Sequence, residues 1–223
     1  MVKNMKKALI VAGGWDGHEP KQTSEVFSKI LSENGFETEV SFSLDSFENA
    51  DYLKTLDLIV PHWTMGTISS TAVKNVCAAV ASGVGIAGCH GGMCDSFRES
   101  TEWQFMTGSQ WVAHPGNAGI TYEVNFNHSS ASPLTEGLSD FSLTSEQYYI
   151  HCDPCVNVLA TTRFAVTDFN ENSSNGVVTV PVIYTKYWGK GKVYYISVGH
   201  VAAVWDIPQA REAIRRGFIW AAK

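Results

Sequence analysis

The sequence predicts an α/β fold: a single domain over residues 1–223, built on a doubly wound, mostly parallel sheet with some antiparallel edge strands. In the first hundred residues, short apolar runs that end at Gly or Pro alternate with helical patterns, which is typical of βαβ units. In the second half, apolar and polar residues alternate along several segments, which indicates strands with one solvated face. We see no linker, repeat or low-complexity tract that would divide the chain.

The elements expected in the first half follow one another in a regular order. Residues 8–12 (Ala-Leu-Ile-Val-Ala) form a continuous apolar strand, and the apolar face of residues 23–34 predicts a helix that Gly35 ends. Further strands are expected at 37–42, 57–60 and 84–87, with a helix at 70–81. Right-handed crossovers between these strands produce a doubly wound sheet.

The second half combines alternating strands with a closing helix. Apolar and polar residues alternate over 120–126 and over parts of 177–185, with a polar turn expected at 170–175. A further apolar strand is expected at 192–198. The last helix is predicted from Pro208 to Ala222, because proline is favoured in the first helical turn.

The composition excludes several classes of protein. With 44% hydrophobic and 17% charged residues, the chain can bury one large core and is not expected to be disordered. A net charge of -6 argues against nucleic-acid binding, which needs clustered Lys and Arg. No run approaches the ~20 apolar residues of a membrane span. The five cysteines are an odd number, as expected of reduced thiols, so a cytoplasmic protein is predicted.

Histidines stand where the predicted strands end. His18 follows the first strand and His62 the third, while His90 and His200 follow the fourth and the last. Ligand sites in open α/β sheets form beyond the carboxyl ends of the strands. Four of the seven histidines are therefore expected at one edge of the sheet, which predicts a site there.

The segment 85–92 (Gly-Ile-Ala-Gly-Cys-His-Gly-Gly) leads from a strand into a helix through small residues. Its end matches G-x-nucleophile-x-G, an elbow that exposes one strained side chain at the top of a sheet, with His90 in the central position. Cys89 is expected to point away as a structural thiol, with a role as nucleophile as the alternative. Cys152 and Cys155 have the spacing of a redox or zinc pair, but a second pair is lacking.

Other loop residues can reach this turn. Asp16 and His18 stand in a glycine-rich turn, residues 13–18, which matches neither the dinucleotide-binding motif nor the P-loop. His114 lies between Trp111 and a further turn. Glu146 stands beside two phenols and is suited to orienting an imidazole or accepting a proton.

In combination, these segments resemble the ThuA-like, or trehalose-utilisation, family, whose flavodoxin-like fold is similar to that of class I glutamine amidotransferases. The matching segments are 13–18, 85–92, 111–116, 146–148 and 186–195 leading to Gly199-His200, and the resemblance extends over nearly the whole chain. The amidotransferase elbow carries cysteine where this chain has His90. In the amidotransferases, a glutamate stands two residues after the final histidine. In this chain, Ala202 stands two residues after His200. Glutamine hydrolysis through a thioester is therefore not expected.

The resemblance implies a role in the catabolism of disaccharides or modified sugars, among them 3-keto sugars. Imidazole suits proton abstraction or return beside a carbonyl group at neutral pH. We expect His90 and His200 to form an acid/base pair. Glu146 is expected to orient them or to act as a second base, with Asp16 as a support. The residues expected to contact the sugar are Trp15, His18, Trp111, His114 and Tyr148.

Aromatic residues support a carbohydrate as the partner. Four of the seven tryptophans lie within five residues of a histidine, namely Trp15, Trp63, Trp111 and Trp205. Such neighbours predict a pocket lined by rings and imidazoles, which suits a neutral polar ligand. An aromatic loop surface can also pair with a second copy of the chain, so a homo-oligomer is an option.

Two functional alternatives stay open from the sequence, besides a structural subunit whose loop histidines are incidental. His18, His90 and His114, together with Glu146, offer nitrogen and oxygen ligands for a divalent metal such as zinc, although no compact motif such as HExxH is present. The other alternative is a non-catalytic sugar-binding or regulatory module that kept the pocket and lost the chemistry, since the amidotransferase cysteine and glutamate are both missing.

Overall fold

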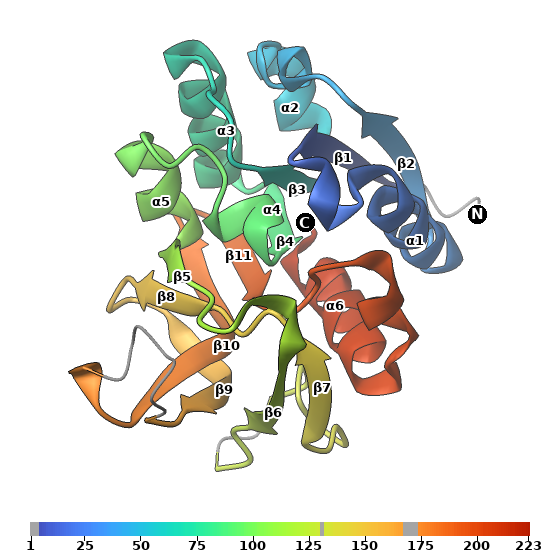
Figure 1. Ribbon diagram of the computed structural model, residues 1–223. Helices are drawn as coiled ribbons and strands as arrows, with labels where there is room; N and C mark the ends of the chain where they lie inside the picture. The colour runs from blue at the N-terminus through green and yellow to red at the C-terminus, as the bar shows by residue number, and fades with distance from the viewer. Residues whose placement is uncertain (1–4, 130–131, 167–173) are drawn as a thin grey trace.

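The first half of the chain folds into alternating strands and helices, as predicted. The computed structural model describes residues 5–129, 132–166 and 174–223 (Figure 1). Its first elements are β1 (Lys6–Gly14), η1 (Asp16–His18), α1 (Pro20–Glu33), β2 (Phe36–Ser41), η2 (Leu44–Phe47), α2 (Ala50–Thr55), β3 (Leu58–Thr64), α3 (Ser70–Ser82) and β4 (Gly85–Cys89). Each strand and helix predicted in this half is present. The largest difference in bounds is at the end of β3, which continues four residues beyond the predicted end.

In the described residues, the second half contains two short α-helices, two 3-10 helices, seven strands and the closing α-helix. In chain order these are α4 (Gly91–Cys94), α5 (Thr101–Thr107), β5 (Ser109–Ala113), η3 (Asn117–Gly119), β6 (Ile120–Phe126), β7 (Phe141–Ser145), β8 (Tyr149–Cys152), β9 (Asn157–Phe164), β10 (Val178–Trp188), β11 (Gly191–Ile196), η5 (Ala202–Asp206) and α6 (Pro208–Ala221). Most of the polar turn predicted at 170–175 lies outside the described residues.

A nine-stranded mixed sheet runs through the molecule in the order β2-β1-β3-β4-β11-β10-β9-β6-β7. The five strands from β2 to β11 are parallel, and the four that follow are antiparallel. The predicted antiparallel strands are thus present, and they form a larger part of the sheet than an edge. β5 and β8 pair separately as a two-stranded antiparallel sheet.

Helices cover both faces of the parallel strands, as a doubly wound sheet requires (Figure 1). Residues 8–12 of β1 are almost fully buried, and they alternate between the two faces. Ile10 points to the side of α1 and α6, where it belongs to one core cluster with Phe27 and Phe218. Val11 points to the other side, into a cluster with Val76 of α3 that also includes α2 and α5 residues.

The carboxyl ends of β1, β3, β4 and β11 meet at one edge of the sheet, because these strands are parallel and adjacent. The loops that leave this edge carry His18, His90 and His200. Of the helices in the described residues, none is long and apolar enough to cross a membrane.

Candidate active site

His90 stands in a strained turn between β4 and α4, as the elbow motif predicts. Its backbone has φ 46° and ψ -141°, a combination that side chains other than hydrogen disfavour. Such residues cost on the order of 1–3 kcal/mol and persist where the surroundings hold them. Here the backbone N–H of His90 donates to the Ile196 carbonyl (2.8 Å), and the Tyr195 hydroxyl donates to the His90 carbonyl (3.2 Å).

The ring of His90 has one nitrogen engaged by the backbone and the other directed at a carboxylate. Nδ1 lies 2.8 Å from the carbonyl oxygen of Ser197, which can only accept, so Nδ1 carries the hydrogen. Nε2 then faces Oε2 of Glu146 at 3.1 Å. Burial lowers the pKa of His90 to about 4, and the contact with the Glu146 carboxylate opposes this shift.

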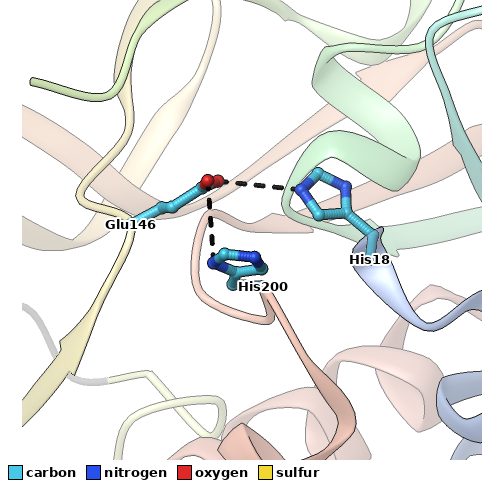
Figure 2. A group of neighbouring side chains, drawn as sticks. All are labelled: His18, Glu146 and His200. Carbon is cyan, nitrogen blue, oxygen red and sulfur yellow. Dashed lines mark ion pairs between the residues drawn. The ribbon is translucent and has the colours of Figure 1, made fainter. Parts of the chain in front are cut away.

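Four imidazoles surround the carboxylate of Glu146, two at each oxygen. His90 Nε2 and His18 Nε2 lie 3.1 Å and 3.6 Å from Oε2. His200 Nδ1 and His114 Nε2 lie 3.7 Å and 3.9 Å from Oε1. Figure 2 shows Glu146 reaching toward His18 and His200, which come from segments at opposite ends of the chain.

Glu146 remains ionised in this environment. Burial by itself raises the pKa of a carboxyl group, but the polar contacts with His18 and His90 and the charge interaction with His200 hold the pKa of Glu146 well below its usual range. The backbone of Glu146 is fixed as well, since its carbonyl accepts a hydrogen bond from the Tyr122 hydroxyl (3.1 Å). The site therefore presents a fixed negative charge to four imidazoles.

Aromatic rings border the cluster. Trp15 is half-exposed and packs edge-on against His18, with ring centroids 4.8 Å apart. The buried ring of Tyr148 stacks on His90 at 3.7 Å and lies nearly parallel to His114 at 5.9 Å. Trp111 lies 5.4 Å from His114. The rings support the imidazoles, and Trp15 also offers a face to solvent.

Two hollows are lined in part by histidines that contact the carboxylate, His114 in one and His200 in the other. One, of about 400 Å³, is lined by residues 111–117, including Trp111 and His114. The other, of about 270 Å³, is lined by η5 and β7 residues together with His200 and Ser145, the residue before Glu146. The larger hollow lies within the roughly 300–1,000 Å³ of small-molecule sites.

The structure gathers most of the residues singled out in the sequence, and two lie elsewhere. Asp16 is exposed, and among the described residues its side chain makes no hydrogen bond or ion pair with the cluster. His62 does not face Glu146, because β3 continues through it and buries its ring against Phe27, with Nδ1 3.8 Å from the Cys89 sulfur. Burial lowers the pKa of His62 to about 3.

Three residues that the sequence did not suggest hold the histidines in place. The Thr64 hydroxyl lies 2.7 Å from His18 Nδ1, and Ser197 provides the carbonyl for His90. Oε2 of Glu19 accepts a hydrogen bond from the backbone N–H of Ala202 (2.9 Å), two residues after His200. In the sequence, Thr64 could have been noticed only as a polar residue at the end of a buried strand. Ser197 contacts His90 through its backbone carbonyl, so the identity of its side chain does not indicate this role.

Cys89 has the environment of a structural thiol. Its side chain is fully buried, and burial raises its pKa far above the usual range, so the nucleophilic thiolate is disfavoured. We expect iodoacetamide to modify the exposed Cys155 of the native protein and to leave Cys89 unmodified, as measured by peptide mass spectrometry. Denatured protein, in which every cysteine is accessible, serves as the control. Comparable rates at the two positions would contradict the structural role.

A comparison of the sequence with models of protein families identifies the family of the chain. The family model for ThuA, described as trehalose utilisation, matches residues 7–221. The chain belongs to the ThuA family. No curated protein matches the sequence.

Solved structures share the fold of this ThuA-family protein at low sequence identity. A putative ThuA-like protein from Bacteroides uniformis has a TM-score of 0.74 and 17% identity, covering 99% of this chain and 93% of that one. A cytoplasmic protein from Salmonella typhimurium has a TM-score of 0.67 and 12% identity, over 97% of this chain and 100% of that one. A β-galactosidase from Bacillus circulans has a TM-score of 0.60 and 14% identity, over 98% of this chain and 30% of that one. These similarities establish the α/β, flavodoxin-like fold.

Proposed function

We propose that this ThuA-family protein is an enzyme that removes a proton from the carbon beside the ketone of an oxidised sugar. The observation that carries the proposal is the pairing of His90 and Glu146. The Nδ1 hydrogen of His90 is committed to the Ser197 carbonyl, so a proton taken from a substrate goes to Nε2. There it lies 3.1 Å from a carboxylate that stabilises the imidazolium formed.

The proposed step is an enolisation. The C–H bond beside the ketone breaks, its electron pair forms a C=C bond, and the carbonyl oxygen takes the negative charge. Nε2 of His90 holds the proton and later returns it to oxygen or to the neighbouring carbon. The sequence paired His90 with His200, but we assign the proton to His90 and Glu146, because the rings of His90 and His200 lie 5.7 Å apart.

A sugar suits the surroundings of the pair. Trp15 exposes a ring on which the apolar face of a pyranose can lie, and the hollows beside His114 and His200 offer room for hydroxyl groups. The name of the family, trehalose utilisation, and the similarity to a β-galactosidase point to the same class of ligand.

We expect the reaction in the cytoplasm, since the five cysteines are unpaired in the described structure.

Deuterium exchange tests this function directly. Keto glycosides are incubated with the full chain in D₂O, and NMR follows the proton on the carbon beside the ketone. We expect that signal to disappear faster than in an enzyme-free blank, while the parent disaccharides without a ketone stay unchanged. A chain that binds a keto sugar saturably without exchange or product would instead be a sugar-binding module, and the proposal would be wrong.

A further inference from the structure

We propose that His18, His200 and Glu146 bind a divalent transition-metal ion, with Zn²⁺ as the expected metal. Nε2 of His18, Nδ1 of His200 and a carboxylate oxygen of Glu146 all lie within 4.8 Å of one another (Figure 2). Two imidazoles and one carboxylate form the ligand set of several zinc enzymes and of non-haem iron sites. Three protein ligands leave coordination positions open for substrate oxygens.

The distances fit shared coordination better than hydrogen bonding. His18 Nε2 and His200 Nδ1 lie 3.6 Å and 3.7 Å from the carboxylate oxygens, beyond the usual range for N–H···O hydrogen bonds. Ligand atoms about 2.1 Å from one tetrahedral metal are roughly 3.4 Å apart. A small movement of the side chains would bring the three atoms onto a common ion.

The unpartnered nitrogen of His18 gives a second, independent indication. Nε2 of this buried ring has no hydrogen-bond partner among the described residues, although a buried polar atom normally has one. The other nitrogen lies 2.7 Å from the Thr64 hydroxyl, which fixes the ring. Metal-binding histidines are commonly held in this way through the nitrogen that does not face the ion.

His90 and His114 complete the surroundings without belonging to the ligand set. Nε2 of His90 lies 3.1 Å from Oε2 of Glu146, and the other ring nitrogen is engaged by the Ser197 carbonyl, so His90 adjoins the ligand set. His114 is the most exposed of the four and the most distant from Glu146, at 3.9 Å. The structure therefore favours His200, where the sequence suggested His90 and His114.

The inference rests on the proposed function for the role of the ion, which would polarise the ketone oxygen while His90 takes the proton, but not for its binding. The test uses the full chain without a polyhistidine tag, treated with chelator and titrated with Zn²⁺ or with Co²⁺, whose visible spectrum reports nitrogen and oxygen ligands. One equivalent is expected to bind.

Variants separate the ligands from their surroundings. His18→Gln and His200→Gln are each expected to weaken binding at least about 100-fold, and Thr64→Val about 10–100-fold, as for other residues that orient a metal ligand. His128→Gln is the matched control, because His128 also lies 3.6 Å from a carboxylate, that of Asp140, but is exposed and outside the cluster. Melting curves verify that each variant is folded.

Each result decides one of the two proposals. No saturable binding to the wild-type chain, or unchanged affinity in both histidine variants, would overturn the metal site. Deuterium exchange that persists in chelator-treated protein would leave the proposed function intact and remove the role of the ion. Tight binding of one equivalent without exchange on any keto sugar would support the metal site and contradict the function.

Discussion

Replacing His90 with asparagine is expected to slow deuterium exchange on keto sugars by about 10²–10⁴-fold, the range that a positioned acid/base group contributes. The asparagine amide can still donate to the Ser197 carbonyl from a position near that of Nδ1, but no atom replaces Nε2 beside Glu146. The variant thus removes the proton acceptor and keeps its anchor. NMR in D₂O measures the exchange, as for the wild-type chain.

A second variant guards against misfolding as the cause. His90→Gly removes the ring and also relieves the positive φ of 46°, since glycine adopts this backbone without steric cost. The relieved strain offsets part of the packing lost with the buried ring, so the variant should fold, as melting curves verify, while losing the exchange. His128→Asn, at an exposed histidine outside the cluster, should exchange normally. Wild-type rates in both His90 variants would eliminate His90 as the base.

The parallel half of the fold is predictable because its strands are buried on both faces. A strand of this kind reads as an uninterrupted apolar run, such as residues 8–12, and Gly or Pro interrupts the pattern near its end. The exception is β3, where Pro61 suggests a stop. Proline is tolerated there because β4 pairs with β3 only at Leu58 and Ile59, so that side of Pro61 has no ladder partner in the described sheet.

The antiparallel half is less predictable, because alternation identifies a strand without naming its neighbour. β6 was visible in the sequence, yet its partners β7 and β9 lie across loops whose lengths contain no pairing information. β10 carries irregular register between Pro181 and Tyr184, which also weakens its alternation. The extent of this half depends on tertiary contacts.

Sequence proximity predicted part of the site. Of the four Trp–His pairs that are close in sequence, two form ring contacts, Trp15 with His18 and Trp111 with His114. Trp205 is instead fully buried under Gly199 and packs against Phe27 in the core. A tryptophan and a histidine that are close in sequence thus contact each other where both lie in a loop beyond the sheet. They do not where one of the two side chains is buried in the core.

Replacing Gly91 with alanine is expected to disturb the site through His18. A Cβ atom at position 91 would lie 2.7 Å from Cε1 and 2.9 Å from Nδ1 of His18, and 2.9 Å from Cγ2 of Thr64. All three distances are too short for carbon contacts, and both neighbours are buried. The imidazole must therefore move, which breaks the contact between Nδ1 and the Thr64 hydroxyl.

Two effects follow from this displacement. Overpacking a buried position typically costs about 1–3 kcal/mol, so the melting temperature should fall. Zn²⁺ affinity should fall about 10–100-fold, as it does when a residue that orients a metal ligand is lost. Gly119→Ala is the matched control, since a Cβ atom there would meet nothing within 4 Å. Calorimetric melting and metal titration of both variants measure the two effects. If Gly91→Ala matched Gly119→Ala in both, the close packing of the elbow glycine against His18 would have no part in holding the site.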